Sequence, residues 1–393
     1  MIDPVELRDF FRQHFHHAPA VFARAPGRLE LLGNHTDYNE GLVLSLAVDK
    51  HIHMAASPRN DGFIELVSTA FPGIEKVAVA DLRKSLDNPW ADYVIGVLLE
   101  LQQLGVRFSG FSAAIHATLP MGAGMSSSAA VEVATALLLK RLFPFSLVHE
   151  TGPETKAGRM SAKEKLALAR VCQSAENRFV GVHCGMLDQI SSLFGRASHA
   201  ILIDCRDVTV ELVPLIGDVS IVICQSGVKH ALVGGEYNEL RRHCEGAVRA
   251  LGVSSLRVVD MEMVEAWRTR LPERDYACAR HIVGEIERVM HGEKALRSGD
   301  FEEFGQCMLQ SHESSRDYFK NSTPELDLLV DIARKHQACL GARLTGGGFG
   351  GATINLVRNS GVENFAAVMA ATYESRSGHK TEPMLCRLAD GAA

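Results

Sequence analysis

The sequence predicts an α+β protein of two domains, and three observations support this fold class. The chain has 393 residues, which is more than one hydrophobic core usually organises. Strand-like and helix-like segments both occur, but without the regular alternation of a parallel α/β sheet. A long stretch of helical pattern, roughly 234–336, separates two groups of strand-like segments. We predict domains at 1–195 and 196–393, with a ligand site in the cleft between them.

Hydrophobic spacing predicts the elements of the first half. Residues 3–17 carry apolar side chains at helical spacing, and 41–57 alternates in the manner of a pair of strands. A strand at 111–119 leads into a loop of small residues. The helix expected at 129–143 is apolar on nearly all faces, which is typical of a buried helix.

The second half begins after a polar segment, 146–163, which predicts an exposed connection before a helix that starts near Ala162. Strands are expected at 199–205 and 219–225, and a last one at 353–357 follows a glycine-rich loop. Because no internal repeat occurs, a solenoid or propeller is not predicted.

Composition predicts an ordinary globular protein, since 46% of the residues are hydrophobic and 22% are charged. The net charge of -6 argues against nucleic acid or an anionic membrane as a partner. No apolar run reaches 18 residues, the nine cysteines include no CxxC pair, and the histidines show no zinc-binding spacing. We therefore expect a cytoplasmic protein with reduced thiols and small-molecule ligands.

The segment PMGAGMSSSAA, residues 120–130, has the composition of a phosphate-binding loop. Its two glycines let the backbone curl closely, and its three serines lead into a helix whose N-terminal N–H groups favour an anion. It lacks the lysine of a Walker A loop, which disfavours an ordinary P-loop protein. A helix simply capped by Ser126 is the alternative interpretation.

A second glycine cluster, LTGGGFGGATINLV at 344–357, formally contains GxGxxG at Gly346, Gly348 and Gly351. A strand rather than a helix is expected after it, so it fails the structural requirement of a dinucleotide-binding fold. A loop that approaches a bound ligand is predicted, and a flexible hairpin turn is the alternative.

The segment PGRLELLGNHTDYNEG, residues 26–41, is the densest group of hydrogen-bonding side chains. Arg28, His35, Asp37, Tyr38 and Asn39 fall within twelve residues. Such a density suits the neighbouring hydroxyls of a sugar. A solvated polar turn is the alternative.

In this order, the three segments resemble those of the GHMP small-molecule kinases, and APGRLELLGNHTDYNEG is similar to the galactokinase signature. PWADYVIGV at 89–97, AENRFVGVHCGMLDQ at 175–189 and GVKHALVGGEYNELRRHCE at 227–245 also resemble galactokinase segments, so the resemblance spans nearly the whole chain. It implies an N-terminal domain like ribosomal-protein-S5 domain 2 and a C-terminal ferredoxin-like domain. The implied activity is ATP-dependent phosphorylation of D-galactose at the C1 hydroxyl, in the Leloir pathway.

The resemblance also implies roles for individual residues. Asp188 would face the C1 hydroxyl, as a base or only as a positioning group, and Arg28 would hold Asp188 and the transferring phosphate. Sugar contacts are implied for Asn34, His35, Asp37, Gly185, Asp188 and Tyr237.

ATP contacts are implied for Gly122, Ala123, Gly124, Met125, Ser126, Ser127, Ser128 and Trp90. Ser127 and Glu176 would hold the Mg²⁺ that accompanies ATP, and Gly346, Gly347 and Gly348 would form a glycine loop near the active site. Glu176 as a solvated helix residue and Trp90 as a core residue are the alternatives. A monomer or weak homo-oligomer is expected.

The signature departs from the family pattern GRxNLIGEHTDY at two positions. Glu30 stands where the family has Asn, and Asn34 stands where the family has the Glu that meets the hydroxyl at sugar C6. Either Glu30 compensates and galactose remains the substrate, or Asn34 widens tolerance at C6 to deoxy, amino or uronic acid sugars.

Two other functions remain as alternatives. One is a galactose- and ATP-binding sensor without turnover, which the intact serine run disfavours. The other is a different GHMP enzyme, such as a mevalonate or homoserine kinase, which would have no reason to carry GNHTDYNEG.

Overall fold

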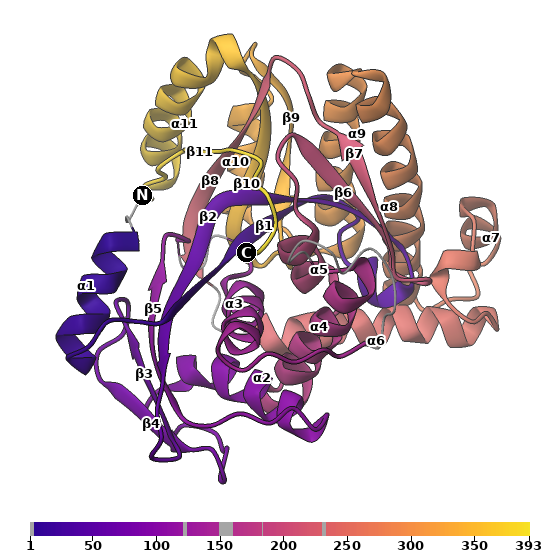
Figure 1. Ribbon diagram of the computed structural model, residues 1–393. Helices are drawn as coiled ribbons and strands as arrows, with labels where there is room; N and C mark the ends of the chain where they lie inside the picture. The colour runs from indigo at the N-terminus through magenta and orange to yellow at the C-terminus, as the bar shows by residue number, and fades with distance from the viewer. Residues whose placement is uncertain (1–3, 121–123, 149–159, 183, 230–232) are drawn as a thin grey trace.

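The computed structural model describes residues 4–120, 124–148, 160–182, 184–229 and 233–393. Two sheets, each covered by helices, make up the molecule (Figure 1). Within the described ranges, no helix is long and apolar enough to cross a membrane. All nine cysteines lie in these ranges and are free thiols.

The first sheet is organised around one long strand, β2 (Leu42–Pro58). One edge of β2 pairs with β1 (Val21–Leu32), and its other edge pairs with β5 (Phe111–Ala117) and β6 (His199–Asp204). The prediction of two strands at 41–57 is therefore wrong. The chain has no glycine or proline in the middle of this segment, so nothing turns the strand.

Three short strands complete the first sheet: β3 (Phe63–Ser68), β4 (Ile74–Ala78) and β7 (Thr209–Pro214). The strand order is β4-β3-β5-β2-β6-β7, with β1 attached to β2. Strands β6 and β7 thus hydrogen-bond in the first sheet although they follow residue 195. If the two domains were divided by sheet, the boundary would fall between β7 and the next strand. The predicted domain boundary after residue 195 stays a prediction.

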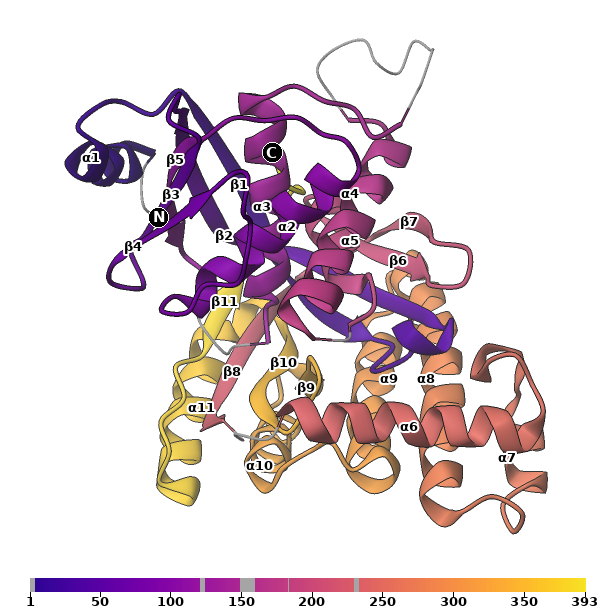
Figure 2. The same cartoon turned by 90° about the horizontal axis from the view of Figure 1, so that it is seen from below.

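Helices cover both faces of the first sheet. Helix α1 (Pro4–Phe15) packs on one face, where Leu7 and Phe11 share a small hydrophobic core with Ala55. The neighbouring strand residue Met54 belongs to the main core, on the opposite face. The helices that contribute to that core are α2 (Asp92–Gln103), α3 (Ser127–Leu142), α4 (Ala162–Ser174) and α5 (Leu187–Phe194), and Figure 2 shows them gathered beside β1 and β2.

The second sheet has four antiparallel strands in the order β11-β8-β10-β9: β8 (Val219–Lys229), β9 (Cys339–Thr345), β10 (Gly350–Arg358) and β11 (Met384–Cys386). Helices follow β8, and α11 (Val362–Ser377) follows β10. This is the βαββαβ pattern of ferredoxin-like folds. The predicted α+β class is confirmed.

The predicted helical stretch is also confirmed. It contains α6 (Val233–Leu251), α7 (Met261–Ala266), α8 (Glu273–Ser298), α9 (Phe301–Ser314) and α10 (Pro324–Ala333). Single-turn elements lie at Asp37–Asn39, Pro89–Ala91, Leu256–Val258 and Asn359–Gly361, and π-helical turns at Ala175–Val180 and Ser315–Phe319.

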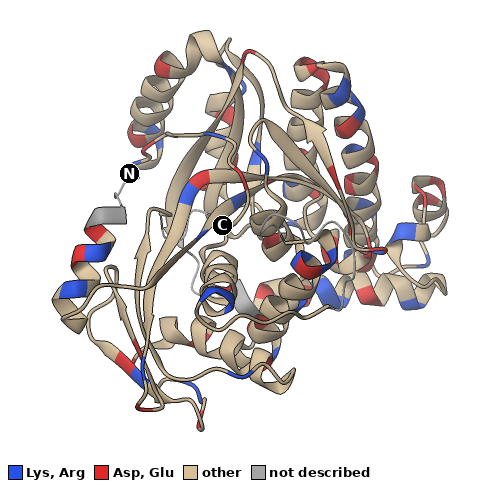
Figure 3. Cartoon of the chain, in the orientation of Figure 1, with Lys and Arg blue, Asp and Glu red and all other residues tan. Residues whose placement is uncertain are grey.

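The two sheets are connected by α9, which contacts β9 of the second sheet and β1 of the first, and by the last residues of the chain. Helix α8 contacts β1, β2 and β7 of the first sheet. After β11, the chain returns to the first sheet, where Arg24 and Ala393 exchange backbone hydrogen bonds of 2.7 and 2.9 Å. Acidic and basic residues alternate along outer helices such as α8 (Figure 3), which is typical of a solvated surface.

Candidate active site

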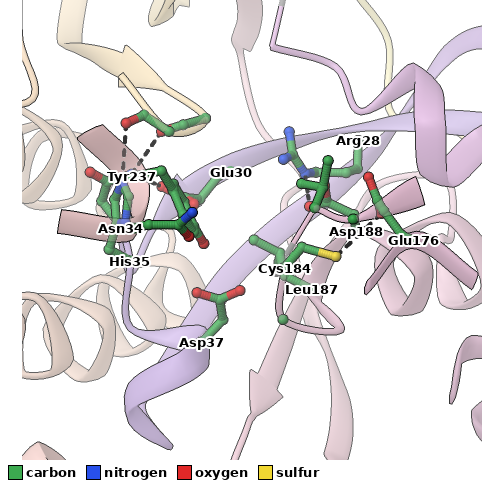
Figure 4. A pocket seen from close by; sticks show the side chains of 16 residues that line it. Arg28, Glu30, Asn34, His35, Asp37, Glu176, Cys184, Leu187, Asp188 and Tyr237 are labelled. Atoms are coloured by element: carbon green, nitrogen blue, oxygen red, sulfur yellow. Dashed lines mark hydrogen bonds and ion pairs between the residues drawn. The ribbon is translucent and has the colours of Figure 1, made fainter. Parts of the chain in front are cut away.

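A cavity of about 430 Å³ lies where the end of β1, the start of α5, α6 and the β9–β10 hairpin meet. Polar side chains point into it from segments that are far apart in the chain (Figure 4). Its lining includes Arg28, Asn34, His35, Asp37, Glu176, Gly185, Asp188, Tyr237, Gly346 and Gly347 of the predicted site residues.

The Arg28–Asp188 pair forms one end of the cavity. Arg28 Nε donates to Asp188 Oδ1 at 2.6 Å, and Arg28 Nη1 donates to the Gly124 carbonyl at 2.5 Å. Burial lowers the pKa of Arg28, but the adjacent Asp188 outweighs it and the pKa is raised. The guanidinium is therefore a fixed positive charge that joins the sugar signature to the serine loop.

Ser126 fixes the other oxygen of Asp188. Its hydroxyl donates to Asp188 Oδ2 at 2.5 Å. Ser126 stands just before α3 with φ of 50°, and its side chain makes no capping hydrogen bond. The interpretation of Ser126 as a plain helix cap is therefore wrong, because its hydroxyl is directed at the carboxylate.

Glu176 lies beside this pair, in the π-helical turn Ala175–Val180. Its Oε2 accepts from Gln189 Nε2 at 2.9 Å and from Cys184 Sγ at 3.2 Å. Burial and then the charge of Asp188 raise the pKa of Glu176. Glu176 is buried, so its interpretation as a solvated helix residue is wrong.

Asp37 and Gly185 meet at one wall of the cavity. A Cβ atom at position 185 would lie 2.1 Å from Asp37 Oδ2, so only glycine leaves room for this carboxylate. Burial, followed by the charges of Asp188 and Glu30, raises the pKa of Asp37 to about 6. An ionised Asp37 is thus held in a site that disfavours its charge.

His35 has a defined tautomer. Its Nε2 lies 3.1 Å from the Gly347 carbonyl, which can only accept, so Nε2 carries the hydrogen. Nδ1 then accepts from the Tyr38 hydroxyl at 2.8 Å. Burial lowers the pKa of His35 to about 4, so the ring is neutral near pH 7. The Tyr237 ring packs against it with centroids 4.8 Å apart.

The glycine-rich segment is the hairpin between β9 and β10, and it also lines the cavity. The Gly346 carbonyl accepts from Asn34 Nδ2 at 2.8 Å. A Cβ at Gly348 would lie 2.2 Å from the Asn321 carbonyl, and its φ is 83°. The segment is therefore a hairpin, as the alternative interpretation has it, and its approach to a bound ligand stays a prediction.

Three further predicted ATP residues, Met125, Ser127 and Trp90, are not part of the cavity lining. Ser127 is the first residue of α3, and Met125 is a buried core residue whose carbonyl accepts from the Arg28 amide at 3.1 Å. Trp90 stacks on Phe71 with ring centroids 6.0 Å apart and packs against the main core. Gly122 and Ala123 lie outside the described residues.

Comparisons with known proteins match this arrangement along the whole chain. The galactokinase galactose-binding signature matches residues 9–58, and the models of the GHMP kinases N terminal domain and GHMP kinases C terminal match 92–196 and 293–375. A galactokinase of Roseiflexus sp. is 40% identical over 100% of this chain and 97% of its own length, and a galactokinase of Homo sapiens is 40% identical over 98% and 95%. The chain belongs to the galactokinase family.

Solved structures agree with this membership. The crystal structure of Lactococcus lactis galactokinase complexed with galactose superposes with a TM-score of 0.91 at 30% identity and covers 99% of both chains. A mevalonate kinase structure reaches a TM-score of 0.62 at 17% identity, over 94% of this chain and 100% of its own, which shows a shared fold alone. The alternatives of a sensor and of another GHMP enzyme gain no support from these relatives.

Three charged or polar residues of this galactokinase-family site have no place in the sequence motifs: Arg343, Asn321 and Glu285. Glu285 of α8 accepts from the Gly33 and Asn34 amides at 3.1 and 3.0 Å and thereby holds the backbone of the sugar signature. A charged residue on an apolar helix face is the one signal that marks Glu285 in the sequence.

Proposed function

We propose that this galactokinase-family protein transfers the γ-phosphoryl group of ATP to the C1 hydroxyl of D-galactose. The observation that carries the proposal is the buried Arg28–Asp188 pair, fixed by Ser126 at one end of a polar cavity. Phosphoryl transfer depends mainly on positioning and charge stabilisation, and this pair supplies both.

Asp188 positions the C1 hydroxyl. Each of its oxygens already accepts one hydrogen bond, from Arg28 and from Ser126. Each oxygen retains a second lone pair, so the carboxylate can accept from the sugar hydroxyl without changing its orientation. Arg28 then offsets the negative charge that develops on the transferring phosphoryl group.

The sugar contacts follow from the same geometry. Asp37 can accept from two neighbouring ring hydroxyls, and the neutral His35 ring is held between Gly347 and Tyr38 beside them. Tyr237, whose pKa burial raises well above its ordinary value, keeps its phenolic hydrogen as a donor. A neutral polyol therefore meets both donors and acceptors in this cavity.

Mg²⁺ fits the chemistry of Ser127 and Glu176, which offer a hydroxyl and a carboxylate oxygen. Burial and then the charge of Asp188 raise the pKa of Glu176, and a nearby cation would offset the repulsion between the two carboxylates. Ser127 is the first residue of α3, and Glu176 lines the cavity beside Asp188. When bound, Mg²⁺ would neutralise the ATP phosphates.

The Asp188→Asn variant tests the proposal. We expect kcat for ADP release with galactose to fall by about 10²–10⁴-fold, while the variant still folds and binds ATP. Asp81→Asn is the matched control, because Asp81 pairs with Arg83 at an exposed site. Near-normal kcat in Asp188→Asn, or pure wild-type protein that binds both ligands without releasing ADP, would contradict the proposal.

The location and the assembly of the protein remain predictions. A reaction that uses only small solutes is consistent with the cytoplasm and with a monomer or weak homo-oligomer.

A further inference from the structure

Glu30 and Asn34 meet at the end of the cavity away from Asp188 (Figure 4). Both side chains are buried, with 4% and 1% of their surface exposed, and Asn34 Nδ2 donates to Glu30 Oε1 at 3.0 Å. A buried carboxylate beside an open cavity is costly unless something uses its charge. The partners of each side chain therefore decide which of them is available to a ligand.

The amide hydrogens of Asn34 are both occupied by the protein. Its Nδ2 donates to Glu30 Oε1 and to the Gly346 carbonyl, so both amide hydrogens are used. Its Oδ1 accepts from Asn321 Nδ2 at 2.8 Å. Asn34 cannot donate to a sugar without giving up one of these bonds.

Glu30 is held on one oxygen only. Oε1 accepts from Asn34 and from Arg343 Nη2 at 2.9 Å. Oε2 has no hydrogen-bond partner among the residues that the structure describes, although Glu30 lines the cavity. This oxygen is therefore an acceptor that lines the cavity and remains available to a ligand.

Arg343 holds the Glu30 carboxylate in place. Its side chain is fully buried under the hairpin, and its charge lies against the Glu30 carboxylate. Because the Arg343 donors Nε and Nη1 have no partner within the described ranges, Glu30 is the carboxylate to which this cation hydrogen-bonds. Removing Glu30 would leave a buried charge unpaired.

We infer that Glu30, and not Asn34, selects the sugar at this end of the cavity. Glu30 Oε2 accepts a hydrogen bond from a galactose hydroxyl on the side of the ring away from C1, and Asn34 is a positioning residue that fixes the carboxylate. This inference rests on the proposed function. It predicts that a neutral hydroxyl is accepted there, whereas a carboxylate substituent is repelled by Glu30.

The first experiment measures kcat/KM of wild type and Glu30→Gln with galactose, the 3-, 4- and 6-deoxygalactoses and galacturonate. With galactose we expect kcat/KM of the variant to fall by about 10–100-fold, mainly through a higher KM. The reason is that the sugar hydroxyl loses its charged acceptor when glutamine replaces Glu30. With one of the deoxy sugars, kcat/KM of wild type and of Glu30→Gln should differ by less than about 3-fold. The hydroxyl that this sugar lacks is then the one that Glu30 binds. Wild type should reject galacturonate.

The second experiment exchanges the two side chains. Glu30→Asn removes the carboxylate, and Asn34→Glu places a second carboxylate against Glu30, so each single variant should lose at least about 30-fold in kcat/KM for galactose. The double variant Glu30→Asn/Asn34→Glu restores one acid and one amide, and we expect it to recover to within about 5-fold of wild type. Thermal unfolding and ATP binding separate misfolding from lost sugar recognition.

Two results would overturn the inference. One is an unchanged kcat/KM for galactose in Glu30→Gln. The other is a loss that is equal for all three deoxy sugars, which would assign Glu30 a structural role alone. Absence of galactose turnover in the wild type would refute the proposed function instead. The inference about Glu30 could then still be tested by comparing the galactose affinities of the variants by calorimetry.

Discussion

Glu285 should stabilise the protein by about 3 kcal/mol, and Glu285→Gln tests this value. In the wild type, Oε2 accepts from the Gly33 amide, the Asn34 amide and the Ser311 hydroxyl at 3.0–3.1 Å, and Oε1 accepts from Arg288 Nε at 2.5 Å. Glutamine has the same shape as glutamate, but its NH₂ group would replace one of the two oxygens, and both oxygens of Glu285 face hydrogen-bond donors. The variant therefore loses hydrogen bonds and leaves Arg288 without its carboxylate.

The magnitude follows from the pKa of Glu285. Burial alone would raise this pKa, but Arg288, His281 and Arg343 outweigh burial and lower it from 4.5 to about 2. At about 1.4 kcal/mol for each tenfold change in proton affinity, this corresponds to about 3 kcal/mol above pH 5. The low folded-state pKa means that the contribution is present at neutral pH and is lost as the pH falls through about 2.

Urea unfolding followed by circular dichroism at several pH values measures this contribution. We expect a difference of about 3 kcal/mol between wild type and Glu285→Gln at pH 7, which shrinks to about half by pH 3. Glu287→Gln is the control, because Glu287 lies on the same helix and makes no hydrogen bond or ion pair within the described ranges. A difference below about 1 kcal/mol at pH 7, or one independent of pH, would refute the reasoning.

Two further predictions concern the wall formed by Asp37 and Gly185. Asp37→Asn should raise stability at pH 7 by about 1–2 kcal/mol, because the raised pKa of Asp37 shows that its charge is disfavoured, while KM for galactose rises about 10-fold or more. Unchanged KM would exclude Asp37 from sugar binding. Gly185→Ala should lower kcat/KM for galactose about 100-fold, since its Cβ would displace the Asp37 carboxylate, whereas Gly235→Ala, whose Cβ meets nothing within 4 Å, should have no effect. Equal activity of both alanine variants would contradict the proposed contact.

Several features of the fold were predictable from local patterns. The buried helix after the serine loop, the helix near Ala162 and the helical stretch of the second half follow from hydrophobic periodicity, which registers which face of an element is buried. The same periodicity failed at 41–57, because a strand that passes from one set of neighbours to another keeps alternating without a turn. It also cannot assign β6 and β7 to a sheet, since strand pairing is a long-range choice.

In the active site too, local sequence patterns predicted some features, and contacts between distant segments decided the others. The composition of residues 26–41 and 120–130 indicated sugar and phosphate chemistry, because those functions need dense hydrogen-bonding groups and small residues in the local chain. The pairing of Arg28 with Asp188, 160 positions later, and the dependence of Gly185 on Asp37 required the folded chain. Short motifs report which groups are available, whereas contacts between distant segments decide what each group does.

The exchange at positions 30 and 34 shows most clearly how far the sequence alone can predict the role of a residue. The sequence by itself determined that an acid and an amide are present in the signature, and that their order departs from the family pattern. Only the tertiary structure decided that Asn321 and Gly346 occupy the amide while Arg343 holds the acid with one oxygen free. The physical reason is that a buried side chain acquires its role from the partners that satisfy it, and those partners come from other parts of the chain.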